Sequence, residues 1–168
     1  YRANEDGLPI GSVNVTRFLE LSRGSPEVDF EGAARIGNRI YWIGSHGRNA
    51  RGEFAPNRQR LFAVEIRDRA GQPHLETVGK AYSRLLSDLA GHPQLAQFNL
   101  GRAAALAPKE DGGLNLEGLC ATKEGHLLIG FRNPIPQGRA LVVPLLNPNS
   151  LVIKGERAQL GDPLLLDQ

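Results

Sequence analysis

The chain has 168 residues, a length typical of one domain, and its 20 basic side chains against 18 acidic ones leave a formal net charge of +2. So small an excess gives no strong global field for a nucleic acid or a membrane surface, and no apolar run approaches the roughly 18 residues that span a bilayer. The single cysteine excludes an internal disulfide and a cysteine-rich zinc site.

The first part of the chain predicts a loop followed by a strand. Residues 1–11 are polar and rich in turn formers, which favours a loop. Residues 12–21 then alternate between apolar and polar side chains, a pattern that predicts a half-buried strand. Its apolar face consists of Val13, Val15, Leu19 and Leu21.

Residues 28–45 and 114–131 are two repeats of one pattern. Glu31-Gly32 in the first repeat matches Glu117-Gly118 in the second, 86 residues later, and Ile43-Gly44 matches Ile129-Gly130 at the same offset without a gap. We interpret the repeats as equivalent strand pairs. The predicted strands cover 28–36 and 39–45 in the first repeat, joined by a tight turn at Gly37-Asn38, and 114–122 and 126–131 in the second.

Each repeat is followed by a loop and two further predicted strands. The first is followed by a loop over 46–58 and strands over 60–67 and 75–78, and the second by a loop over 132–138 and strands over 140–146 and from 151–153. Four short antiparallel strands in succession are the content of one propeller blade. The apolar residues 164–166 predict a strand of a further blade.

The spacing of the apolar residues changes between the two repeats. Apolar residues recur there at helical spacing, and Gly91 and Pro93 end the pattern, so the sequence predicts a helical insertion over residues 82–108. Such an insertion explains why the offset is about twice the roughly 40–45 residues usual for a blade. The helical face consists of Tyr82, Leu85, Leu86 and Leu89.

These elements predict an all-β fold: a partial β-propeller of about two four-stranded antiparallel blades plus flanking strands, with a short helical insertion, in a single domain over residues 1–168. Two blades do not close a ring, and their open edges invite pairing with other chains. Because the chain begins at Tyr1 and contains no methionine, we expect it to be a fragment of a larger propeller.

Several stretches resemble a known family: residues 31–49 (EGAARIGNRIYWIGSHGRN), 60–64 (RLFAV), 114–119 (LNLEGL) and 127–134 (LLIGFRNP). They are similar to an uncharacterised bacterial family, domain of unknown function 3616, which is itself distantly similar to the esterase-like phytase propellers. The resemblance implies a β-propeller in a longer bacterial protein. It carries no established reaction, so it assigns no catalytic residue. The choice between the bacterial cytoplasm and the periplasm stays open.

An acidic set is the first candidate site. Asp29 and Glu31 are two residues apart, hence on one face of their strand, and Asn115 and Glu117 repeat the arrangement. If these strands are the innermost of neighbouring blades, four oxygen-bearing side chains face one channel, where Ca²⁺ or Mg²⁺ would find the ligands it prefers. The alternative is that each glutamate pairs with a neighbouring arginine or accepts backbone N–H bonds.

The loops after the two repeats form the second candidate site. Six arginines lie between residues 35 and 60 against one acidic side chain, and guanidinium groups recognise phosphate and carboxylate. A small anionic ligand is therefore predicted at these loops, with a solvated arginine-rich loop as the alternative. The anion-binding candidates are Ser45, His46, Arg48, Asn49, Arg132 and Asn133.

Nucleophilic catalysis finds no support. Ser45 and His46 are adjacent, so on an extended strand they point to opposite sides, and Cys120 occupies an apolar strand position predicted to be buried. Two functions stay open. The first is a metal-assisted hydrolase of an anionic ester or phosphoester, with Glu31, Glu117 and Asp29 holding the cation. The second is a non-enzymatic scaffold that binds a ligand or a protein.

Overall fold

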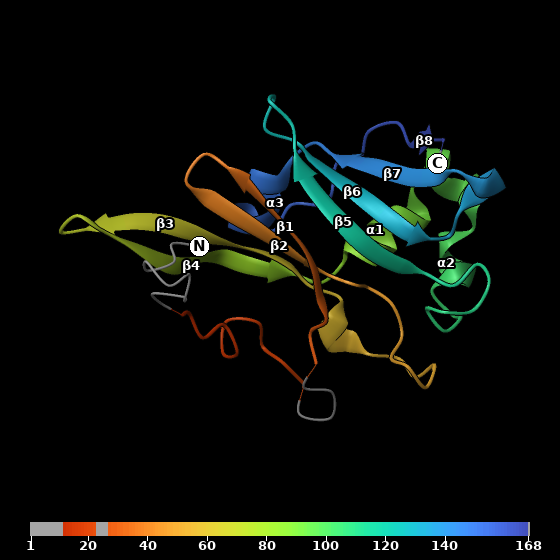
Figure 1. The fold of residues 1–168 in the computed structure, drawn as a ribbon, viewed down its shortest axis with the longest axis horizontal. Helices are drawn as coiled ribbons and strands as arrows, with labels where there is room; N and C mark the ends of the chain where they lie inside the picture. The colour runs from red at the N-terminus through yellow and green to blue at the C-terminus, as the bar shows by residue number, and fades with distance from the viewer. Residues whose placement is uncertain (1–11, 23–26, 168) are drawn as a thin grey trace, which may run out of the picture.

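The computed structural model describes residues 12–22 and 27–167, so the loop predicted over residues 1–11 lies outside the described residues. Eight strands form two four-stranded antiparallel sheets, and in each sheet the strands lie in chain order (Figure 1). The prediction of two four-stranded antiparallel sheets is confirmed, and the fold is mostly β. None of the helices in the described ranges is long and apolar enough to cross a membrane.

Sheet 1 contains the first repeat. Gly37 and Asn38 form the predicted turn between its first two strands, and Ala70 and Gly71, both with positive φ, form the tight turn between its last two. That second turn is shorter than predicted, so the last two strands are longer. The strands are β1 (Phe30–Ile36), β2 (Arg39–Gly44), β3 (Leu61–Arg69) and β4 (Gln72–Tyr82), with a short helix η1 (Pro56–Arg58) between β2 and β3.

Three short helices follow β4, in the region where the sequence changes to a helical period: α1 (Leu85–Gly91), η2 (Pro93–Phe98) and α2 (Leu100–Ala103). Figure 1 shows α1 and α2 behind the strands of sheet 2. Leu85 and Leu89 of α1 are fully buried in the main core with side chains of both sheets. The helices therefore extend the core between the two sheets.

Sheet 2 contains the second repeat: β5 (Asn115–Ala121), β6 (Leu127–Asn133), β7 (Ala140–Leu145) and β8 (Leu164–Leu166), with η3 (Pro136–Gly138) before β7. The strand predicted from 151–153 is wrong, because α3 (Pro148–Lys154) occupies these residues. Pro148 suits the first turn of a helix, and Gly155 ends it in the left-handed conformation. The assignment of 164–166 to a further blade is also wrong, since β8 pairs with β7.

The strand predicted over residues 12–21 is wrong as well. Residues 16–20 form turns, in which Leu19 N–H donates to the Val15 carbonyl at 2.9 Å and Glu20 has a positive φ. The alternating apolar side chains have another cause: the segment packs on the face of sheet 1 that points away from sheet 2, where Leu19 forms a second core with Phe62 and Val64. Burial on a flat surface produces the alternation without any strand pairing.

The two repeats share a β-bulge at the Glu-Gly pair. In sheet 1, Phe30 pairs with Gly44 and Gly32 with Ile43, so Glu31 is the extra residue. In sheet 2, the same irregularity makes Glu117 the extra residue, but Gly118 pairs with Gly130 rather than with Ile129. The constant offset of 86 is therefore wrong for the second strand, because the turn between β5 and β6 is one residue longer than the turn between β1 and β2.

The two sheets meet where β1 and β5 run side by side (Figure 1). A Cβ atom added at Gly32 would lie 2.8 Å from Leu119 Cβ and 3.0 Å from Leu119 N, so only glycine allows this approach. The Ser45 carbonyl, at the end of β2, accepts the Leu116 N–H of β5 at 2.8 Å. One close contact and one inter-sheet hydrogen bond thus fix the inner strands together.

A buried carboxylate ties α1 to the C-terminal part of the chain. Asp88 is only 7% exposed, and its carboxylate accepts hydrogen bonds from the Tyr82 hydroxyl and, at 3.1 Å, from the Ala158 N–H. Arg157 forms an ion pair with the other oxygen at 2.5 Å. Two segments about 70 residues apart in the sequence therefore share one buried charge, which needs all of these partners to be stable in the core.

The substitution Gly32→Ala should destabilise the protein by about 1–3 kcal/mol, because the added methyl group forces β1 and β5 apart. Urea unfolding monitored by circular dichroism measures the change. Gly91→Ala is the matched control, since a Cβ at Gly91 meets no atom within 4 Å. Equal stabilities of the two variants would contradict the close packing of the inner strands.

Candidate functional site

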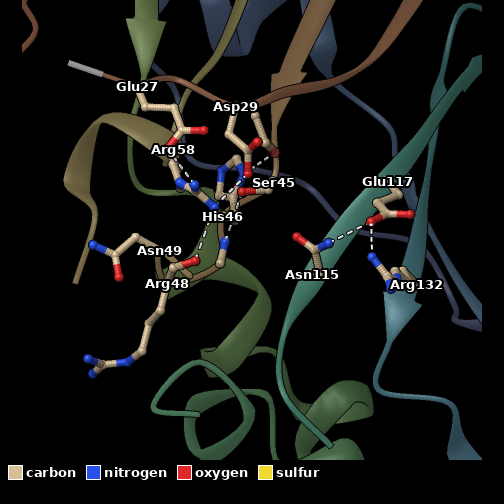
Figure 2. Close-up of polar contacts among 12 residues, drawn as sticks. Glu27, Asp29, Ser45, His46, Arg48, Asn49, Arg58, Asn115, Glu117 and Arg132 are labelled. Atoms are coloured by element: carbon tan, nitrogen blue, oxygen red, sulfur yellow. Dashed lines mark hydrogen bonds and ion pairs between the residues drawn. The ribbon is translucent and has the colours of Figure 1, made fainter. Parts of the chain in front are cut away.

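The loop entering β1 carries one group of ionised side chains. The Arg58 guanidinium forms ion pairs with Asp29 at 2.7 Å and with Glu27 at 2.6 Å, and it donates to the Arg48 carbonyl at 3.1 Å. Figure 2 shows Glu27 and Asp29 gathered around Arg58. Asp29 has a positive φ of 54°, and its carbonyl accepts the Ser45 N–H at 2.9 Å. The predicted ligand Asp29 is therefore held by an arginine.

A second group lies across the contact between the sheets, on β5 and β6 (Figure 2). The Glu117 carboxylate accepts hydrogen bonds from Arg132 at 2.8 Å and from the Asn115 side-chain amide at 2.7 Å. The sequence placed Asn115 and Glu117 in a metal set and Arg132 in an anion set. The structure links the three to one another, through the glutamate–arginine pairing that the sequence left open as an alternative.

Glu31 lies between these two groups. Partial burial raises the pKa of its carboxyl group, and the nearby charges of Asp29 and Glu117 raise it further, whereas Arg58 lowers it. A hydrogen bond to the Asp29 carboxyl group adds to the increase. The matched bulges therefore bring the three predicted carboxylates within electrostatic reach of one another. In the described ranges, however, no group of three or more His, Cys, Asp and Glu side chains is arranged to hold a metal ion.

Ser45 and His46 are buried where the chain leaves β2, rather than exposed in a loop. The Ser45 hydroxyl accepts the Gly47 N–H at 3.4 Å, and His46 Nδ1 lies 2.8 Å from the Gly44 carbonyl, to which it donates. Burial lowers the pKa of His46 to about 4, so its imidazole is neutral at pH 7. Its Nε2 is buried with no hydrogen-bond partner among the described residues.

The other anion-binding candidates also have partners within the protein. Arg48 donates to the Ala104 carbonyl at 3.1 Å and to the Gly52 carbonyl at 2.9 Å, and in Figure 2 its guanidinium extends away from the carboxylates. The Asn49 side chain accepts the Glu53 N–H at 2.9 Å and closes its own loop. Asn133 donates to a backbone carbonyl at 3.2 Å. The six candidates therefore do not converge on one shared pocket.

A basic hollow on sheet 1 was missed by the sequence analysis. Its volume is about 390 Å³, and Arg17, Arg60 and Lys80 line it together with Glu20. Burial lowers the pKa of Arg60, whose guanidinium donates to three backbone carbonyls. These cations are far apart in sequence, so no local pattern could have indicated that they share one hollow.

The prediction of a buried Cys120 is wrong, because this residue is exposed on β5. Leu119, its neighbour, packs against the main core, so Cys120 points to the opposite face of sheet 2. The sequence predicted the alternation of side chains along this strand, but it did not predict which face of the strand the rest of the protein covers.

Fold and site together define a mostly β protein that repeats a four-stranded sheet with a glutamate at a bulge of its first strand. The chain matches the model of a family described as "Protein of unknown function (DUF3616)" over residues 59–154, more than half of its length, and it belongs to that family. The resemblance to domain of unknown function 3616 is thereby confirmed, whereas the propeller fold and the similarity to phytase propellers that it implied stay predictions. Neither the search of curated proteins nor the search of solved structures found a match.

The buried imidazole of His46 should make stability depend on pH. Its folded-state pKa of about 4 lies below the usual 6.5, so the unfolded chain binds the extra proton and stability falls as the pH drops from 6.5 to 4. His46→Asn removes this group and keeps a residue that tolerates the positive φ of 55°. Relative to this variant, the native protein should lose about 3 kcal/mol between pH 7 and pH 4.

Urea unfolding of both proteins at several pH values measures this difference. His74→Asn, which replaces an exposed histidine of β4, is the control and should follow the native protein. A stability difference between native and His46→Asn proteins that stays constant with pH would show that His46 does not titrate as its burial requires.

Proposed function

We propose that the chain forms two neighbouring blades of a larger β-propeller, and that it serves as a non-enzymatic scaffold whose inner strands bind a positively charged ligand. The matched bulges at Glu31 and Glu117 are the observation that carries the proposal, because they turn the same carboxylate of each repeat toward one inner edge. A repeated site on adjacent sheets is typical of propellers, which build binding surfaces from equivalent positions of successive blades.

The faces of the sheets support the propeller arrangement. Gly32 faces sheet 2, whereas its repeat equivalent Gly118 faces away from sheet 1. Equivalent faces therefore point in the same rotational direction around the contact, as in successive blades. In a two-fold sandwich, they would point toward each other.

The charges of the inner edge support a cationic ligand. Four carboxylates meet two guanidinium groups there, and Glu31 has no ion pair with either arginine within 4.0 Å among the described residues. Burial and repulsion raise its pKa, so a bound positive charge would relieve an unfavourable interaction. The carboxylates are those of Glu27, Asp29, Glu31 and Glu117, and the guanidinium groups are those of Arg58 and Arg132.

The residues that could act in catalysis are not arranged as a nucleophile and a base. Ser45 and His46 do not hydrogen-bond to each other, and the buried Nε2 of His46 has no proton donor to activate among the described residues. Arg48 and Arg132 already bind groups of the protein itself, which favours a role in supporting the fold. A scaffold needs neither a nucleophile nor a base.

Binding of a tetralysine peptide to the complete polypeptide, followed by calorimetry at low and physiological salt, tests the scaffold. We expect binding that weakens with salt and falls at least about fivefold in Glu31→Gln, since one charge contact is lost. Glu110→Gln, in an exposed loop before β5, is the matched control and should bind like the native protein. Absence of binding at low salt, or equal binding by both variants, would refute the proposal.

A metal-assisted hydrolase of an anionic ester or phosphoester is the second candidate. The crowding of Asp29, Glu31 and Glu117 favours it, because oxygen ligands with like charges suit Ca²⁺ or Mg²⁺. The cation would come from solution, and the anionic substrate would have to displace Arg132 from Glu117.

Two measurements separate the candidates. A hydrolase should cleave p-nitrophenyl phosphate or p-nitrophenyl acetate above the blank rate only with Ca²⁺ or Mg²⁺, and lose this activity in Glu31→Gln. A scaffold should leave both rates at the blank. If Ca²⁺ raises the melting temperature of the native protein but not of Glu31→Gln, without any hydrolysis, the ligand of the scaffold is the metal ion rather than an amine.

A further inference from the structure

One face of sheet 2 is apolar, and its residues are exposed or half-buried among the described residues. It points away from sheet 1 and bears no charged side chain over seven positions, although a solvent-facing sheet usually alternates with polar residues. Arg132, which follows Leu128 and Gly130 on the same side of β6 and pairs with Glu117, marks the charged border of this face. Leu164 is 44% exposed, and Cys120 is exposed too. This outer face consists of Gly118, Cys120, Leu128, Gly130, Val142, Pro144 and Leu164.

The equivalent face of sheet 1 shows what such a face packs against. With the bulges aligned, Gly32 corresponds to Gly118, Ala34 to Cys120 and Tyr41 to Leu128, through the same cross-strand pairs. In sheet 1, Ala34 and Tyr41 are buried, and sheet 2 covers them. In sheet 2, the matching positions are exposed or half-buried.

The glycines make the correspondence specific. A Cβ atom added at Gly32 would lie 2.8 Å from Leu119 Cβ, on the first strand of the next sheet. The atoms nearest to a Cβ added at Gly118 belong to Gly130, its cross-strand neighbour in the same sheet. Because neither Gly118 nor Gly130 carries a side chain, a branched side chain of another first strand could approach the backbone of sheet 2 at this pair.

We infer that the outer face of sheet 2 is the packing surface for a third four-stranded sheet carried by the same polypeptide. The first strand of that sheet lies along β5 and places a large aliphatic side chain over Gly118, as Leu119 does over Gly32. This inference rests on the proposed propeller arrangement and names the partner of its open side.

A second copy of this chain fits the face less well. Sheet 1 of such a copy would have to dock through the face that points away from its own sheet 2. That face is already covered by the segment over residues 12–22, with Leu19 buried against Phe62 and Val64. The face of sheet 2 that covers sheet 1 is likewise buried within each copy. A second copy therefore offers no free face equivalent to the one with which sheet 2 covers sheet 1, and this separates the third sheet from docking of that kind between copies.

Thiol labelling of Cys120 in the complete polypeptide tests the inference, because the only cysteine of these 168 residues lies on the outer face. Maleimide labelling followed by peptide mass mapping reads this residue alone, and Cys120→Ser is the control for the assignment. A third sheet should slow labelling at least about a hundredfold relative to the urea-unfolded polypeptide, because reaction then requires local opening.

The outcomes are distinct. Protection that is independent of protein concentration, in a monomer, supports the third sheet. Labelling near the unfolded rate overturns it, and so does protection that appears only with dimer formation, which would assign the face to a second copy. Tetralysine binding is measured separately. If Cys120 is protected but the peptide does not bind, the third sheet is supported and the proposed ligand is rejected. If the peptide binds but Cys120 is not protected, the ligand is supported and the third sheet is rejected.

A pair of substitutions gives an independent readout. Leu164 on the outer face and Ile153 on α3 are similarly exposed here, at 44% and 40%. In the complete polypeptide, Leu164→Glu should lower the melting temperature by several degrees because it buries a charge against the third sheet, whereas Ile153→Glu should leave it nearly unchanged. Equal effects of the two substitutions would overturn the inference.

Discussion

The close approach of β1 and β5 is the constraint on which the rest of the structure depends. Gly32 leaves the space that Leu119 occupies, and the Ser45 carbonyl reaches across to the Leu116 N–H. Since both inner strands carry a bulge next to this contact, their extra residues, Glu31 and Glu117, are brought toward each other. The acidic inner edge is thus a consequence of backbone packing, and the arginines on either side compensate only part of its charge.

The arginines of the first loop serve the backbone. An irregular loop leaves carbonyl groups that no neighbouring strand satisfies, and a guanidinium group with five N–H donors can bind several of them at once. Arg48, Arg58 and Arg60 all donate to loop carbonyls. A cluster of arginines in a sequence therefore has two physical meanings, ligand recognition and loop support, and the geometry here is that of loop support.

Sequence periodicity predicted both sheets, because burial on one face leaves an alternating pattern that a single sequence records. The repeat predicted that Glu31 and Glu117 are equivalent, but not that each is the extra residue of a bulge. The alternating pattern misled at residues 12–21, which are buried on one side without strand partners. At residues 151–153, where a strand was predicted, Pro148 begins a helix instead. The partners of Glu117 and Arg58 were not predictable individually, since spacing in the sequence does not say which charges from separate strands meet.

Asp88 has a consequence for the order in which the chain acquires its structure during synthesis. Helix α1 leaves the ribosome about 70 residues before Ala158 and Arg157, which supply two of the three partners of this carboxylate. Until they arrive, the charge of Asp88 favours a hydrated helix that is not yet docked. We therefore expect the core to close around α1 only after Arg157 and Ala158 have been synthesised, late in these 168 residues.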